Sequence, residues 1–249
     1  ALAAAPGFVA SPTPTTLSIA ALPSQDDPAF DAFQPGSPIG LLGLELETRR
    51  RNRANGRIGS IAANGFTAEI AQSFGNCAKY IQIRNRLQDG QGLASTASSL
   101  SGLDEEARAL IAGADTLFIA SAAALDAETG GIDISHRGGR PGFVRVDGDT
   151  LTVPDFAGNN YFNTFGNLLQ EPRAALLFVD FATGGLLQLQ GEADIVWQGP
   201  ELTRLDGAER LWRFHVKRGW RRAHALSLRW SEPDFAPTTL QTGLWSVAA

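Results

Sequence analysis

Short runs of apolar, β-branched and aromatic residues alternate with Gly, Pro, Asn and Asp along most of the chain. This pattern is typical of β-barrels and β-sandwiches rather than of helical bundles. In LLQLQGEADIVW (186–197) the apolar positions partly alternate with polar ones, as in a strand with one solvated face. The strands predicted in this way span 6–10, 16–21, 39–47, 56–62, 66–73, 115–122, 132–137, 141–146, 149–153, 174–181, 185–197 and 209–217.

Few segments carry a helical pattern. The clearest is LDEEARALIA at 103–112, where Ser101 is a plausible N-cap, acidic residues fill the first turn, and Gly113 ends the helix. Two shorter helices are predicted at 26–33 and 161–169. Both precede strands of similar sequence, so they are expected to occupy equivalent positions in two units.

The two halves of the chain repeat one pattern. PGFVASPTPTTLSI (6–19) corresponds to PGFVRVDGDTLTV (141–153), at a spacing of 135 residues. SPIGLLGLEL (37–46) corresponds to EPRAALLFVDF (171–181), with Pro38 and Pro172 134 residues apart. A repeat of this length is a whole domain. The sequence therefore predicts two similar β units in tandem, with a ligand-binding groove between them.

The copies differ at their start. The second PGFV follows DTLFIASAAALDAETGGIDISHRGGR (115–140), which reads as strand, Gly-rich turn and strand, whereas only ALAAA precedes the first. The first unit is thus expected to lack its first strand, through processing or truncation or because that strand lies upstream. The predicted organisation is a first unit over 1–87, a small, polar linker over 88–102, and a second unit with a C-terminal arm over 103–249.

Composition narrows the possible functions. Lys and Arg total 21 against 26 Asp and Glu, and a net charge of −5 does not favour a nucleic-acid partner. No apolar run reaches the roughly 18 residues that span a bilayer, and no signal segment is evident, so we expect a soluble cytoplasmic protein. One Cys excludes an internal disulfide framework, and the three His have no metal-binding spacing.

The segment 133–145, DISHRGGRPGFVR, carries the richest chemistry. Strand alternation places Ser135 and Arg137 on one face and His136 and Arg140 on the other. Its paired glycines would let a flat ring or a phosphate approach the backbone, and its two arginines could bind that phosphate. A β-bulge with two solvated arginines is an equally supported interpretation.

Four Asn lie within nine positions where a loop is expected to enter the helix at 161–169: Asn159, Asn160, Asn163 and Asn167. Asn commonly caps a helix start, which is the simpler interpretation. The alternative is that the helix N-terminus and some of these amides face an anionic ligand, since one cap does not require four Asn.

The first copy has its own polar cluster. TRRRNRANGR (48–57) holds five Arg in ten positions, either as a solvated connection or as a groove cap that neutralises a phosphate, with Arg51 and Arg53 as candidates. QSFGNCAKYIQIR (72–84) adds Asn76, Cys77 and Lys79. A neighbouring base could lower the pKa of Cys77, but a lone Cys is more often an inert filler, and no His partner is evident nearby.

These segments resemble the FMN-binding split β-barrel superfamily related to pyridoxamine 5′-phosphate oxidase. The similarity rests on ISHRGGRPGFVRV, on TLTVPDFAGNNYFNTFGNLLQEPRAALLF, and in the first copy on LLGLELETRRRNRANGR and QSFGNCAKYIQ. The last two are similar to the bacterial branch of predicted flavin-nucleotide-binding proteins with two barrel regions. The resemblance implies two split-barrel units and FMN between barrels. It also implies cofactor contacts from Ser135, His136, Arg137, Arg140, Asn159, Asn160 and Asn163.

One departure bears on the cofactor. Many members carry Ser-x-Lys or Ser-Arg-Lys before an Asn-Leu pair to bind the FMN phosphate, whereas this chain has Phe162-Asn163-Thr164 before Asn167-Leu168. Either arginines of the first copy replace the missing cation, or FMN binding is weak or lost.

The resemblance leads us to expect an FMN-dependent oxidoreductase acting on a small molecule other than pyridoxamine phosphate, with a donor such as NAD(P)H and a homodimeric assembly. His136 is the candidate proton donor, although a backbone carbonyl could equally hold it. The alternative is a non-catalytic flavin, haem or small-ligand binding protein that kept the fold, and a third possibility is a barrel used only for dimerisation.

Overall fold

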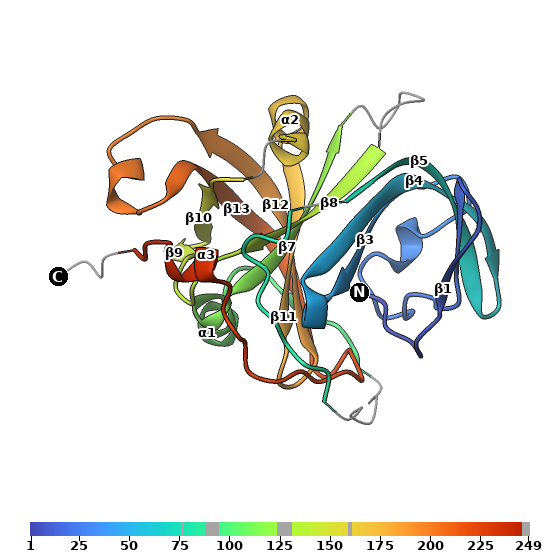
Figure 1. Cartoon of the computed structure of the whole chain (residues 1–249). Coiled ribbons are helices and arrows are strands. Elements are labelled where there is room, and N and C mark those ends of the chain that lie inside the picture. Colours follow the sequence, from blue (N-terminus) through green and yellow to red (C-terminus); the bar gives the residue numbers. More distant parts are fainter. Residues whose placement is uncertain (76, 88–94, 124–130, 159–160, 246–249) are drawn as a thin grey trace.

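Two antiparallel sheets and three α-helices make up the computed structural model, which describes residues 1–75, 77–87, 95–123, 131–158 and 161–245 (Figure 1). The prediction of a mainly β protein with few helices is confirmed. None of the described helices is long and apolar enough to cross a membrane.

The first sheet has five strands around a small apolar core. Their order is β1 (Val9–Thr13), β2 (Thr16–Ile19), β5 (Gly65–Gly75), β4 (Arg50–Ala62) and β3 (Pro38–Glu45). Burial of Ile19, Ile58, Phe66 and Ala68 against partly buried neighbours holds this sheet together.

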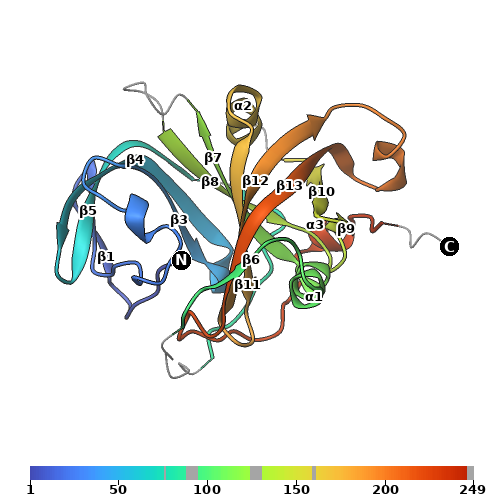
Figure 2. The same ribbon diagram turned by 180° about the vertical axis from the view of Figure 1, so that it is seen from behind.

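The second sheet has eight strands. Its main path runs β8 (Gly131–Gly138), β7 (Thr116–Ala123), β11 (Arg173–Asp180), β12 (Gly185–Val196), β13 (Ala208–Arg222), β10 (Thr150–Phe156) and β9 (Arg145–Asp147). The short β6 (Ser98–Leu100) pairs with β13, as the view from behind in Figure 2 shows. The larger core lies here, with Trp212, Phe143, Phe165, Phe178 and Phe214 fully buried.

The two sheets repeat one topology. The order β1-β2-β5-β4-β3 recurs as β9-β10-β13-β12-β11. The register repeats as well: Pro38 faces Arg57, and Arg173 faces Glu192, each 135 positions later. Both long hairpins also carry a bulge at the same place, before Gly56 and before Gly191. The shared order, register and bulge confirm the tandem arrangement inferred from the repeat.

The second sheet extends beyond this shared part by the hairpin β7–β8. The described residues before β1 form no strand that corresponds to that hairpin. The position beside β3 is taken by the second unit, because β3 and β4 both lie against β8. This contact brings the arginine-rich strand of the first copy next to DISHRGG of the second.

The helices differ in part from expectation. Helix α1 (Glu105–Gly113) begins after Asp104, whose carboxylate accepts from the Ala107 N–H at 2.9 Å, so Asp104 rather than Ser101 is the N-cap. Helix α2 (Asn163–Gln170) follows Phe162, a residue in the left-handed conformation without a side-chain cap, so the N-cap position is not an Asn. The helix predicted at 26–33 is wrong: only a 3-10 turn at Phe30–Ala32 forms there. The remaining helix is the short α3 (Pro237–Leu240).

Two predicted strands are shifted. Residues 6–8 and 141–144 form turns, and the strands start later, at Val9 and Arg145. Phe143 and Val144 are nevertheless buried, which explains their strand-like apolar pattern. Of the linker predicted at 88–102, residues 88–94 lie outside the described residues and Ser98–Leu100 form β6. The division of the chain into 1–87 and 103–249 stays a prediction.

The segment before that linker packs on the second unit. Ile83 forms a β-bridge with Asp234, and Arg86 forms one with Trp230. The Gln82 amide is fully buried and bonds the Tyr80 carbonyl, Thr239 and the Ala236 N–H. The C-terminal arm is therefore fastened to residues 80–86.

Candidate functional site

A groove of about 1050 Å³ lies between the first sheet and the part of the second unit formed by α2 and the adjoining ends of β7 and β8. β4 and β5 form one wall, and α2 with the ends of β7 and β8 forms the other. Small-molecule sites have volumes of about 300–1,000 Å³. The groove is thus large enough for a ligand of cofactor size.

Exposed aromatic rings and side-chain amides line this groove. Tyr161 is 70% exposed and packs near Phe74 at 5.8 Å between ring centroids, and Phe162 is 38% exposed. Asn55 and Asn163 contribute amides from opposite walls. Half-exposed rings beside amides offer both a stacking surface and hydrogen bonds to a flat polar heterocycle.

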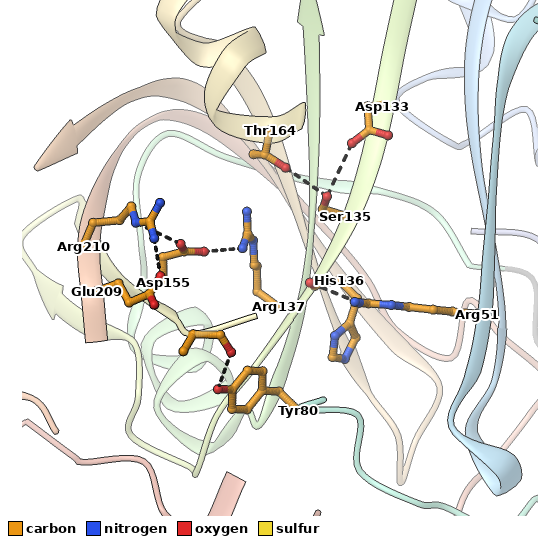
Figure 3. A network of polar contacts seen from close by, with 11 residues as sticks. Arg51, Tyr80, Asp133, Ser135, His136, Arg137, Asp155, Thr164, Glu209 and Arg210 are labelled. Atoms are coloured by element: carbon orange, nitrogen blue, oxygen red, sulfur yellow. Dashed lines mark hydrogen bonds and ion pairs between the residues drawn. The ribbon is translucent and has the colours of Figure 1, made fainter. Parts of the chain in front are cut away.

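A buried polar network joins β4 to β8 beside the groove. Figure 3 shows its part on β8 and α2, where Asp133, Ser135 and Thr164 meet. Arg53 donates to Asp133 at 2.9 Å with both side chains almost fully buried, and Asn55 donates to the same carboxylate at 3.1 Å. Ser135 lies 3.4 Å from Asp133 and accepts from the Thr164 hydroxyl at 2.9 Å. One carboxylate therefore links the first sheet, β8 and the first turn of α2.

Arg137 belongs to a second buried ion pair. Its guanidinium contacts Asp155 on β10, whose other oxygen lies 3.3 Å from Arg210 on β13. Arg137 and Arg210 also lie near the Phe165 ring, 5.2 and 5.8 Å from its centroid. Burial lowers the pKa of Arg137, and the Asp155 carboxylate opposes that shift. The charge of Arg137 is thus balanced within the protein interior by the Asp155 carboxylate.

His136 points away from Arg137, toward Arg51 on β4 (Figure 3). Arg51 donates to the His136 carbonyl at 3.4 Å. Burial lowers the pKa of His136 well below its ordinary value, and the nearby guanidinium groups of Arg51, Arg137 and Arg53 act in the same direction. The imidazole is therefore neutral at pH 7, which makes it a poor proton donor.

A cavity of about 40 Å³ lies beside His136. Its lining comes from β4, residues 77–80, β8 and β10: Arg51, Cys77, Lys79, Tyr80, His136, Arg137, Gly138, Pro154, Phe156 and Gly158. This volume is far below that of a cofactor site. It has room for a few water molecules or for one small anion.

Other residues of the protein fill the space beside the paired glycines at the end of β8, Gly138 and Gly139. A Cβ on Gly138 would lie 2.1 Å from the Tyr80 carbonyl oxygen, and one on Gly139 would lie 2.4 Å from the Phe143 ring. The side of each glycine that a Cβ would occupy is therefore filled by the protein, although Gly138 still lines the small cavity. The two glycines allow residues 80 and 143 to pack against the strand.

The predicted site residues fall into separate places. Asn163 lines the groove, whereas Arg51, Lys79, His136 and Arg137 line the small cavity. Ser135 and Arg53 are buried in the network between the two.

Of the other candidates, one is described, and it lies outside both cavities. Arg140 is half-buried and lines neither of them. Asn76, Asn159 and Asn160 lie outside the described residues.

Sequence reasoning missed the acidic partners Asp133 and Asp155, as well as Asn55 and Arg210. The available signal was the spacing of Asp133 and Ser135, which places both on one face of a strand that also carries Arg137. A buried arginine charge is destabilising unless a carboxylate pairs with it. Asp133 on the same strand and Asp155 in the next candidate segment were the acids available for such a pair. Within the described residues, no cluster of three His, Cys, Asp or Glu could hold a metal ion.

The second half of the chain matches the model of a known protein family. The family model described as pyridoxamine 5′-phosphate oxidase matches residues 103–229, from α1 to beyond β13. The chain belongs to this family. The resemblance noted in the sequence is thereby confirmed, and the match covers the second unit. A search of curated proteins finds no match.

Several solved structures are similar to about half of this chain. HupZ of Group A Streptococcus is 17% identical, with a TM-score of 0.38 over 48% of this chain and 93% of HupZ. A putative pyridoxamine 5′-phosphate oxidase from Lactobacillus delbrueckii is 13% identical, with a TM-score of 0.39 over 48% and 94% of the two chains. A general stress protein 26-related protein from Clostridium acetobutylicum is 15% identical, with a TM-score of 0.35 over 52% and 96%.

Proposed function

We propose that the protein is a flavoprotein that binds FMN in the groove between its two sheets and acts as an oxidoreductase on a small molecule. The observation that carries this proposal is the groove of about 1050 Å³, in a chain of the pyridoxamine 5′-phosphate oxidase family. The cavity beside His136, at about 40 Å³, is too small for a flavin.

The groove lining suits a flat, polar ring system. Tyr161 and Phe162 offer ring faces for stacking, while Asn163 offers a donor and an acceptor to ring heteroatoms. Asn167 is held toward Ser121 at 3.1 Å, so its amide is orientated before a ligand enters. These residues would position the flavin.

The phosphate would bind differently from the usual arrangement. Arg53 and Arg137 are neutralised by Asp133 and Asp155, so neither is free to balance a phosphate. The groove still contains Arg57 on β4 and the first turn of α2, whose backbone N–H groups favour an anion. We assign the phosphate to these two elements.

Bound FMN would supply the hydride or electron transfer, as cofactors do in such enzymes. The protein would hold the ring in the groove, and the buried Arg53–Asp133 pair would keep β4 and β8 at a fixed separation beneath it. His136 faces the small cavity rather than the groove, so we assign it no proton transfer to the flavin.

The test is FMN binding with a blocked groove. Gly166 lines the groove on α2, and a Cβ there would meet nothing within 4 Å. Gly166→Trp should project an indole into the groove and weaken FMN binding at least 100-fold, measured by flavin fluorescence quenching and by the visible spectrum. Gly166→Ala is the matched control and should bind FMN like the wild type. Equal binding by all three proteins would refute the groove as the flavin site.

A non-catalytic carrier is the second candidate, because the interior arginines are already paired with carboxylates. The FMN-loaded protein, mixed with NADPH or NADH and then with air, separates the two candidates. Bleaching of the flavin bands followed by their return supports the oxidoreductase. Flavin that binds yet is reduced no faster than free FMN supports the carrier.

A further inference from the structure

The cavity beside His136 is the strongest feature that the proposed flavin site leaves unused. It is lined by three basic side chains, those of Arg51, Lys79 and Arg137, and its described lining contains no carboxylate. Arg137 is already paired with Asp155. Arg51 and Lys79, in contrast, form no ion pair with any carboxylate of the described chain.

An unpartnered buried atom accompanies this charge. His136 is 5% exposed, yet its Nε2 finds no hydrogen-bond partner within the described residues, and the Nε of Arg51 is likewise unpaired. A buried polar atom without a partner is destabilising unless water or a ligand satisfies it. Both residues line the cavity, so a group bound there is a candidate partner for these two atoms.

We propose that this cavity is a binding site for a small oxyanion, such as free phosphate or the carboxylate or phosphate group of a small ligand, separate from the groove. Arg51 would provide the fixed charge, Lys79 a mobile charge at the opening, and the neutral imidazole of His136 a donor from Nε2. The volume of about 40 Å³ limits the site to one such group.

The geometry gives each residue a defined place. Arg51 is held by the His136 carbonyl, which orientates its guanidinium toward the cavity. Tyr80, fixed by its hydroxyl bond to the Ala157 carbonyl at 2.8 Å, closes one side. Burial and the neighbouring arginines lower the pKa of Arg51 to about 10. Arg51 therefore stays protonated at neutral pH, and an incoming anion would relieve the repulsion among these cations.

Inorganic phosphate is the first probe, added to the flavin-free protein. Binding is measured by calorimetry, and occupancy of the site by the ¹⁵N signals of the His136 ring, which a His136→Gln variant assigns. We expect a saturable shift of those signals. Arg51→Gln and Lys79→Gln should each weaken phosphate binding, the former by about tenfold or more because a charge-assisted hydrogen bond is lost. Lys79 is exposed, so its variant should fold even if the Arg51 variant does not.

Arg50→Gln is the matched control. Arg50 is the neighbour of Arg51 on β4, is exposed and points to the opposite face of the strand, so the same loss of charge should leave phosphate affinity within twofold of the wild type. Equal weakening by Arg50→Gln, or the absence of a phosphate-dependent shift at His136, would overturn the proposal.

A competition experiment identifies the source of the oxyanion. With a separate site, saturating phosphate leaves FMN and riboflavin affinities unchanged. Phosphate that weakens FMN but not riboflavin would mean that the cavity holds the phosphate of the groove ligand, and the separate site would be refuted. Because phosphate binding is measured without flavin, its result does not depend on whether the protein binds FMN.

Discussion

Arg53 of β4 and Asp133 of β8 join the two sheets through an ion pair of 2.9 Å, with side chains that are 3% and 5% exposed. These residues come from the two copies of the repeat and lie 80 positions apart in the chain. Asp133 also lines the groove, and β4 and β8 contribute residues to both the groove and the cavity, so the pair sets the separation of strands that line both.

Removing one partner of this pair should be strongly destabilising. Arg53→Ala leaves Asp133 buried without its cation, and such a loss costs about 3–5 kcal/mol of unfolding free energy. Urea denaturation at pH 7 measures the change. The double variant Arg53→Met with Asp133→Leu should be more stable than Arg53→Ala, because no charge is left buried. A double variant that is as unstable as the single one would contradict this account.

The bulge that both units share predicts that Gly56 and Gly191 do not tolerate a side chain. A Cβ on Gly56 would lie 1.9 Å from the Glu69 carbonyl oxygen, and one on Gly191 would lie 2.1 Å from that of His215. Gly56→Ala and Gly191→Ala should therefore each lower the melting temperature, since the strands must move apart. Gly131→Ala is the control, because a Cβ there meets nothing within 4 Å. Melting temperatures equal to that control would show that the bulges tolerate a side chain.

His136 should make stability depend on pH. Its folded-state pKa is lowered well below the ordinary value of about 6.5, first by burial and then by Arg51, Arg137 and Arg53. As the pH falls below 6.5, the unfolded chain gains a proton at this residue and the folded protein does not. The stabilising contribution is thus complete above pH 6.5 and declines below it, by at most about 1.4 kcal/mol per pH unit.

The measurement is the unfolding free energy of wild type and His136→Gln between pH 7.5 and 5. The difference between the two proteins should change over that interval, with the wild type losing more stability as the pH falls. Parallel curves would mean that His136 takes up its proton equally in both states.

Gln82 should hold the C-terminal arm in place. Its buried amide bonds Thr239 at 3.1 Å and the Ala236 N–H at 3.0 Å. Gln82→Leu removes both bonds to the arm, together with the bond to the Tyr80 carbonyl, and leaves buried groups unpaired, a loss of about 1–3 kcal/mol. We expect lower thermal stability and faster proteolysis after residue 230, followed by mass spectrometry. Exposed Gln72 provides the control as Gln72→Leu, whose cleavage rate at the arm should match the wild type.

Local sequence patterns predicted most strands and the repeat, because alternation and turn residues depend on a few neighbouring positions. They failed where a buried residue does not have strand conformation. Phe143 is fully buried like a strand residue, yet it lies in a turn segment. The helix predicted at 26–33 rested on equivalence with 161–169, but only a 3-10 turn formed in the first copy.

The candidate site was harder to predict for a different reason. The residue types identified Arg53 and Arg137 as cations of interest, but a cation can pair with a ligand or with an acid of the protein. The choice depends on Asp133 and Asp155, and the pairing of Arg53 with Asp133 depends on how β4 packs against β8. No local pattern describes contacts of that range.

The two walls of the groove belong to one polypeptide. A pocket formed between separate subunits empties when the protein is diluted below the dissociation constant of the assembly. Here β4 and α2 remain tethered at any protein concentration, so ligand affinity should be the same in a nanomolar and a micromolar solution. The two walls also consist of different residues of the chain. A substitution in one wall therefore changes the contacts to one side of the ligand and leaves those on the other side unchanged.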